Sequence, residues 1–154
     1  PLTGLKEEVF SKIMQNNVMS NIALMNMVGP EMAERKDGVF IIVSSIGGLV
    51  GSSHIAAYNM SKAADINLVK SLAMEWGKHN IRVNAVAPTF IRTPGTESCL
   101  ADPAFRSNVV ERIAALHRIG EPMDVAGAVV FLASAAASLI TGHTLLIDGG
   151  WTAL

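Results

Sequence analysis

The chain has 154 residues, of which 50% are hydrophobic and 16% charged, enough apolar material for one packed domain and not the composition of a disordered or collagen-like chain. Twelve basic against thirteen acidic residues give a net charge of −1, so no long-range field favours a nucleic acid or an anionic membrane as partner. A single cysteine, Cys99, and four histidines without a paired spacing predict no disulfide and no metal site, in a cytoplasmic protein.

Helical periodicity dominates the N-terminal half. Apolar residues recur at threes and fours from about Lys6 to Glu34, which predicts one long helix, or two in series, ending at Lys36–Gly38. The apolar stripe is wider than one face, so we expect a sheet on one side of this helix and another helix on the other. The β-branched run Val39–Val43 predicts a strand covered on both faces, and Ala56–Lys78 predicts a second long helix.

The C-terminal half alternates strands with shorter helical patterns. Ile81–Pro88 predicts a second strand that stops at its proline, and Thr89–Pro103 predicts a turn-rich loop. Apolar spacing from Phe105 to Leu116 indicates a short amphipathic helix. Met123–Ala133 predicts a third major helix that starts after a proline, and Thr144–Ile147 predicts the last strand.

This order of elements predicts an α/β fold in which parallel strands are joined by right-handed crossovers, with helices on both faces and one domain over residues 1–154. In open α/β sheets the ligand lies outside the carboxyl ends of the strands. The polar residues at those ends are Ser45 after the first strand, Tyr58 and Lys62 at the start of the next helix, and the segment 88–93 after the second strand.

Tyr58, the only tyrosine, and Lys62 are four residues apart, which places their Cβ atoms about 5–6 Å apart on one helix face. Lowering a phenol pKa from about 10 to about 7 takes about 4 kcal/mol, which a nearby ammonium and a cationic cofactor ring could supply. Taken alone, the pair fits a half-buried tyrosine beside a solvated lysine better than a catalytic pair. Ser45 favours the catalytic interpretation, because it lies thirteen residues before Tyr58 at a strand end that faces the same crevice.

Four segments in this order resemble the classical short-chain dehydrogenase/reductase family across nearly the whole chain: IIVSSIGG (41–48), YNMSK (58–62), IRVNAVAP (81–88) and TGHTLLIDGG (141–150). The resemblance is strongest to bacterial 3-oxoacyl carrier-protein reductases and sugar or polyol dehydrogenases. It implies part of a Rossmann-like, doubly wound parallel sheet. It also implies an oxidoreductase that moves a hydride between NAD or NADP and a carbonyl or secondary alcohol.

The same resemblance implies a role for each catalytic residue. Tyr58 would be the general acid and base, and Ser45 would donate a hydrogen bond to the substrate oxygen. Lys62 would lower the phenol pKa and bind the nicotinamide ribose. Asn17 would hold the water of a proton relay.

Two of these assignments have neighbours that compete with them. Asn16 and Asn21 lie close to Asn17, which is preferred because the valine that follows it matches the family pattern. Ser44 adjoins Ser45, and only Ser45 has the family's spacing to the tyrosine.

The segment after the second strand resembles the family's nicotinamide loop, so Pro88, Ile91 and Thr93 are predicted to contact the cofactor along with Tyr58 and Lys62. Thr89 stands where the family has glycine, which calls the backbone geometry of the loop into question. Gly47–Gly51 does not have GxGxxG spacing and is interpreted as a flexible loop on the substrate side, not as a dinucleotide site.

The family's opening TGxxxGxG segment has no counterpart here, so the resemblance implies that the chain corresponds to the C-terminal part of such an enzyme. We therefore expect an open edge at Val39–Val43 and weak cofactor binding by this part alone. The alternative is a non-catalytic association module. In either case the two long helices are expected to form a homo-oligomer, a dimer or tetramer, through the apolar residues Met19, Met27, Leu68 and Leu72.

Overall fold

A three-stranded parallel sheet forms the centre of the computed structural model, which describes residues 3–153. The strands are β1 (Gly38–Val43), β2 (Ile81–Pro88) and β3 (Thr144–Ile147), in the order β1-β2-β3. Phe40 lies opposite Val83 in the first pair, and Val86 opposite Leu145 in the second. The predicted strands and their parallel arrangement are confirmed, with β1 starting one residue earlier than expected.

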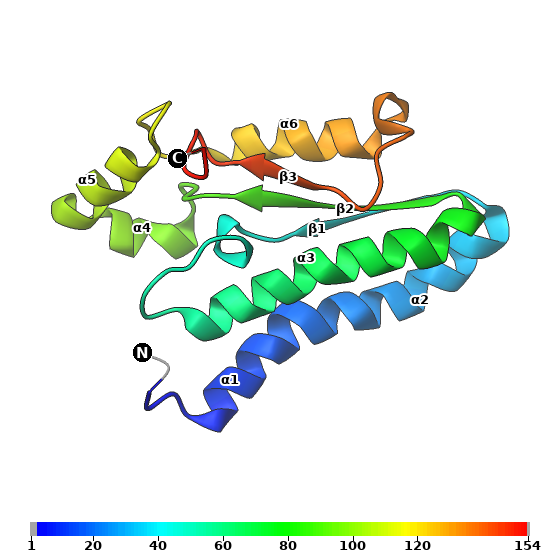
Figure 1. Ribbon diagram of the computed structural model, residues 1–154, viewed down its shortest axis with the longest axis horizontal. Coiled ribbons are helices and arrows are strands. Elements are labelled where there is room, and N and C mark those ends of the chain that lie inside the picture. Colours follow the sequence, from blue (N-terminus) through cyan, green and yellow to red (C-terminus); the bar gives the residue numbers. More distant parts are fainter. Residues whose placement is uncertain (1–2, 154) are drawn as a thin grey trace.

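Helices cover both faces of the sheet, as predicted. The helix α1 (Glu7–Met14), the π-helical turn η1 (Gln15–Met19) and α2 (Ser20–Arg35) follow one another without a break. On one face α2 and α3 (Ala56–Trp76) cover the sheet, and α1 lies against the start of α3; α6 (Pro122–Ala133) covers the other face (Figure 1).

The sheet contributes to two apolar clusters, one on each face. Toward α2 and α3 the cluster contains Phe40, Ile42, Val69 and Val83, and toward α6 it contains Val86, Leu132 and Ala137. Burial of each large aliphatic side chain stabilises the fold by about 1.5–3 kcal/mol. Because β2 is buried on both faces, the polar groups at its carboxyl end have a rigid support.

The prediction of a turn-rich loop over Thr89–Pro103 is wrong. Helix α4 (Pro94–Leu100) lies within it, and α5 (Pro103–Arg112) follows after two residues. Each helix has proline in its first turn, and the Asp102 carboxylate accepts a hydrogen bond from the Ala104 amide at 2.9 Å. The Thr-Pro and Asp-Pro pairs are therefore helix starts. In the sequence this signal is hard to recognise, because the segment is rich in residues that also form turns.

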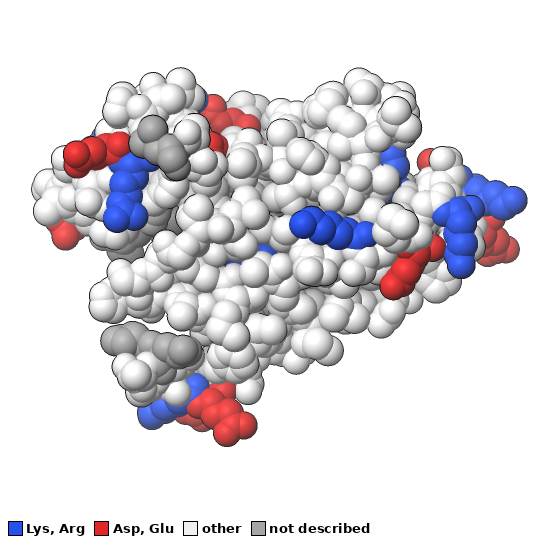
Figure 2. Space-filling model, viewed as in Figure 1, with Lys and Arg blue, Asp and Glu red and all other residues white. Residues whose placement is uncertain are grey.

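The charged side chains lie mainly toward the ends of the molecule, and much of the middle is uncharged in the view of Figure 2. Several large apolar side chains are exposed, among them Met27 (78%) on α2 and Met74 (85%) on α3. Within residues 3–153 no helix has both the length and the apolar character that a membrane crossing requires.

Candidate active site

The segment that follows β1 packs tightly against the first half of α3. It forms a short 3-10 helix, η2 (Ile46–Gly48). A Cβ on Gly47 would lie 2.6 Å from the Asn59 Oδ1 atom, and a Cβ on Gly48 would lie 2.7 Å from the carbonyl oxygen of Lys62. The interpretation of this region as a flexible loop is therefore wrong for its first half, since both glycines are needed for close approach to the helix.

The two adjacent serines make different contacts. Ser44 is buried, and its hydroxyl donates to the Lys62 carbonyl at 2.9 Å. The half-buried Ser45 hydroxyl accepts a hydrogen bond from the Gly47 amide at 3.1 Å, and its own hydrogen has no acceptor in the described part of the chain. Ser44 thus ties the strand end to the helix, whereas Ser45 keeps a donor for another group.

The predicted Asn17 lies in the π-helical turn η1, facing α3. Its Nδ2 atom donates to the Ser61 hydroxyl at 2.9 Å, and that hydroxyl donates to the Tyr58 carbonyl at 2.7 Å. Of its two competitors, Asn16 is exposed, while Asn21 faces α3 and donates to the Asn17 carbonyl at 2.8 Å. Single π turns are common at functional sites, because they present one residue out of helical register.

Lys62 brings a positive charge to the carboxyl end of β1. Its Nζ atom donates to the Val43 carbonyl at 2.9 Å and to Asp65 Oδ2 at 3.2 Å, and it lies 5.9 Å from the centroid of the Tyr58 ring. The side chain is 12% exposed. An ammonium has three hydrogens, so one remains for a further partner.

Asp65 belongs to this cluster although the sequence motifs do not predict it. Its side chain is fully buried and accepts hydrogen bonds from Lys62 and, through Oδ1, from Asn21 at 3.0 Å. Burial raises the pKa of this carboxyl, and the contacts with Lys62 and Asn21 oppose that rise. A carboxylate three residues after a lysine, on a helix side otherwise occupied by Ile66 and Val69, is the signal that was available.

The predicted cofactor loop continues β2 toward α4. Ile91 forms a parallel bridge with Gly120, and its carbonyl accepts from the Thr96 hydroxyl at 2.6 Å. Thr93 precedes α4, and its amide donates to the same hydroxyl at 3.0 Å. The expected backbone conflict at Thr89 does not arise, because this residue is not among those with positive φ. Its buried Oγ1 atom has no partner within the described residues.

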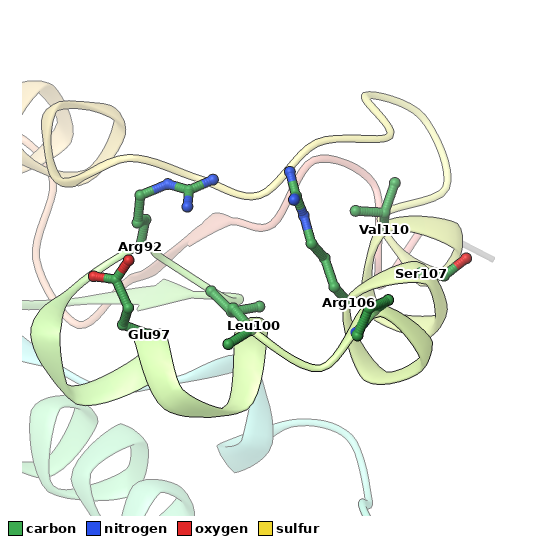
Figure 3. A pocket seen from close by; sticks show the side chains of 8 residues that line it. Arg92, Glu97, Leu100, Arg106, Ser107 and Val110 are labelled. Atoms are coloured by element: carbon green, nitrogen blue, oxygen red, sulfur yellow. The ribbon is translucent and has the colours of Figure 1, made fainter.

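A cavity of about 520 Å³ lies between α4 and α5 and is lined in part by Arg92, Glu97 and Arg106 (Figure 3). None of the four predicted catalytic side chains lines it. The cavity is therefore separate from the polar cluster around Tyr58 and Lys62.

Comparison with known proteins decides the family. Residues 1–152 match the enoyl-(acyl carrier protein) reductase family. The chain is 42% identical over 149 residues to dehydrogenase/reductase SDR family member 4 of Bos taurus, with 97% of this chain and 53% of the relative covered. The chain belongs to the short-chain dehydrogenase/reductase family. The resemblance inferred from the four sequence segments is thereby confirmed.

Other members of the short-chain dehydrogenase/reductase family are similar over the same region. A tropinone reductase homolog of Arabidopsis thaliana is 40% identical, with 99% of this chain and 49% of the relative covered. The chain thus spans about half the length of the curated relatives it matches.

Solved structures of dehydrogenases share the fold, as expected for part of a doubly wound sheet. A gluconate 5-dehydrogenase from Burkholderia cenocepacia, in complex with NADP and tartrate, matches with a TM-score of 0.97 at 28% identity, covering 100% of this chain and 60% of that one. A 4-hydroxyisoleucine dehydrogenase complexed with NADH matches with a TM-score of 0.94 at 36% identity, covering 100% and 63%.

Proposed function

We propose that the full-length protein is an NAD(P)-dependent oxidoreductase that moves a hydride between the cofactor and a carbonyl or secondary-alcohol substrate of sugar, polyol or 3-oxoacyl type. Family membership supports the reaction class. The observation that carries the proposal for this chain is the position of the Lys62 ammonium, 5.9 Å from the centroid of the Tyr58 ring and next to the end of β1.

In this proposal Tyr58 handles the proton. Its hydroxyl donates a proton to the substrate oxygen during reduction and takes it back during oxidation. The Lys62 ammonium stabilises the phenolate, and the Ser45 hydroxyl, whose hydrogen is uncommitted, donates to the same substrate oxygen. Asn17, linked to the Tyr58 carbonyl through Ser61, orders the helix face on which a proton-relay water would sit.

The residues present fit the nicotinamide end of the cofactor, which supplies or accepts the hydride when bound. The third ammonium hydrogen of Lys62 suits a ribose hydroxyl. Pro88, Ile91 and Thr93 belong to the segment that we propose contacts the nicotinamide carboxamide. The unpartnered Thr89 hydroxyl in that loop supports a polar occupant. We further propose that residues 1–154 form one domain equivalent to the C-terminal part of the family's enzymes.

Replacement of Tyr58 by phenylalanine in the full-length protein tests the proposal. The variant Tyr58→Phe removes only the hydroxyl, and we expect carbonyl reduction to fall by about 10²–10⁴-fold, the usual contribution of a positioned acid. NAD(P)H binding, followed by fluorescence, serves as the control and is expected to change little. Unchanged turnover in the variant would exclude Tyr58 as the acid.

A second candidate function is association alone. Met19 and Met27 are exposed on the α1–α2 side, which supports an apolar contact between copies and a homo-oligomer. The expected contribution of Leu72 is wrong, because this side chain is buried in the core, and Leu68 packs against the same core. A full-length protein that self-associates and has no redox activity would favour this candidate.

A further inference from the structure

Asp65 is an ionisable group that the proposed mechanism does not use. It lies in the middle of α3 with no exposed surface, one turn after Lys62. Removing a carboxylate from water is costly unless the charge is paired and hydrogen-bonded. Both oxygens are used, Oδ2 by the Lys62 ammonium at 3.2 Å and Oδ1 by the Asn21 carboxamide at 3.0 Å.

These contacts fix the Lys62 ammonium in space. The ammonium lies between the Val43 carbonyl at the end of β1 and the Asp65 carboxylate on its own helix. Asn21, which holds the other carboxylate oxygen, also donates to the Asn17 carbonyl in the π turn. One hydrogen-bonded network therefore connects the π turn, the carboxylate, the ammonium and the end of the first strand.

We propose that Asp65 is a positioning residue of the active site, which anchors the Lys62 ammonium and sets how strongly its positive charge acts on the Tyr58 phenol. The proposal rests on the function proposed above. Asp65 and Tyr58 lie on opposite sides of Lys62 along α3, so the carboxylate offsets part of the ammonium's charge at the phenol.

Few other charges act on this cluster. No titratable side chain belongs to β1, η1, η2 or the first two turns of α2. The charged residues of α1 are exposed to solvent: Glu7, Glu8 and Lys12. His54, in the loop before α3, is also exposed. Within residues 3–153, Asp65 is the only carboxylate in an ion pair with Lys62.

The sign of the effect follows from electrostatics. Loss of a negative charge near the phenol favours the phenolate, so the Tyr58 pKa falls when Asp65 is neutralised and Lys62 stays protonated. Asp65 and Tyr58 are seven residues apart, or about 10 Å along the helix, where one charge shifts a pKa by roughly half to one unit at a partly screened site.

The test titrates Tyr58 directly in the full-length protein. The phenolate absorption of the protein minus that of its Tyr58→Phe variant isolates this one tyrosine and needs no turnover. With Asp65→Asn, which keeps the size and, through its one acceptor oxygen, the hydrogen bond from Lys62 but loses the one from Asn21, we expect the midpoint to move down by roughly half to one pH unit. Glu75→Gln, which removes an exposed carboxylate at the far end of α3, is the matched control and should leave the midpoint unchanged.

A second variant, Asp65→Leu, removes the charge and replaces it by an apolar side chain of similar size, so it covers the case in which Asp65→Asn does not fold. In Asp65→Asn, which keeps the bond to Lys62, a downward shift supports the proposal, and in an active enzyme the acidic limb of alcohol oxidation moves with it; a midpoint that stays in place or rises in this variant overturns it. Asp65→Leu also releases the ammonium, so its midpoint should differ from that of the parent protein, and an unchanged midpoint there means that Asp65 is structural only. Failure of the proposed function is seen separately, as unchanged turnover in Tyr58→Phe.

Discussion

Lys62 is joined to the end of β1 by two hydrogen bonds that run in opposite senses. Its ammonium donates to the Val43 carbonyl, and its own carbonyl accepts from the Ser44 hydroxyl. Strand and helix are therefore held in one register at the site, and the lysine loses most of the rotamer freedom that a long side chain normally keeps. The position of the ammonium relative to Tyr58 is a consequence of this local arrangement.

Asp148 performs a comparable task in the last turn of the chain. Its carboxylate accepts hydrogen bonds from the Gly150 amide at 3.1 Å, the Thr152 amide at 2.9 Å and the Thr152 hydroxyl at 2.6 Å. Burial opposes ionisation, but these hydrogen bonds prevail and lower the Asp148 pKa. We expect Asp148→Asn, which lacks the second acceptor oxygen, to lower the free energy of unfolding at pH 7 by about 1–3 kcal/mol.

The pH dependence of this loss has a definite sign. The Asp148 pKa is lower in the folded protein than in the unfolded chain, where it is about 3.9. The stabilisation is therefore complete above the pKa of the unfolded chain and is lost as the pH falls through the pKa of the folded protein. Urea unfolding from pH 7 to pH 3 should therefore give a constant difference between the protein and Asp148→Asn down to about pH 4, then a shrinking one. A difference that stays constant to pH 3 would contradict this account.

At the level of elements, the 3-10 helix η2 determines how closely the strand end approaches α3. A Cβ on Gly48 would lie 2.7 Å from the Lys62 carbonyl oxygen and 2.8 Å from the Ile66 Cδ1 atom. The backbone of Lys62 cannot move aside as a flexible side chain does, so Gly48→Ala should destabilise the fold by about 1–3 kcal/mol and push this turn of α3 away from Ser45 and the end of β1.

Gly51 is the matched control, since a Cβ there meets nothing within 4 Å. Gly51→Ala should leave the melting temperature unchanged or raise it slightly, because alanine reduces the freedom of the unfolded chain. Thermal unfolding of both variants, together with turnover in the full-length protein, tests the packing of η2. Equal melting temperatures for the two would show that this close approach is not needed.

The elements that the sequence predicts best are those with one dominant physical signal. Ile81–Pro88 contains three β-branched residues and ends at a proline, and its predicted bounds agree with those of β2. The π turn at Gln15–Met19 has no such signal, because the same apolar spacing continues through it. The sequence does not predict helix α4, because its residues favour turns as much as helices.

The residues of the candidate site also differ in how well the sequence predicts them. Ser45, Tyr58 and Lys62 follow from spacing and from their places at strand and helix ends. For Asp65 the sequence carries only a weak signal, a carboxylate on an apolar helix side, and it gives no sign of the partner Asn21, forty-four residues earlier in the chain. Contacts between distant segments become visible only when the packing of α2 against α3 is known.

For the molecule as a whole, the important feature is the outer edge of β1, which no strand within residues 3–153 covers. The Ser44 amide donates to the Val86 carbonyl, so the backbone of Ser44 faces β2. Along a parallel strand, the backbone amides and carbonyls of every second residue point to the same side. The amides and carbonyls of Val39, Ile41 and Val43 therefore face away from β2. Val43 is 57% exposed, and in the described chain its carbonyl is occupied only by Lys62.

An open, apolar edge of this kind pairs readily with another strand, so we expect the 154-residue chain expressed alone to self-associate through β1. Val39→Pro removes one outward amide without breaking the β1–β2 ladder, and it should weaken self-association about tenfold, which corresponds to about 1.4 kcal/mol. Val39→Ala shortens the same side chain and keeps the amide, so it should associate as the parent chain does. Sedimentation over a range of concentrations measures both. If Val39→Ala and Val39→Pro weaken association equally, side-chain packing and not strand pairing holds the copies together.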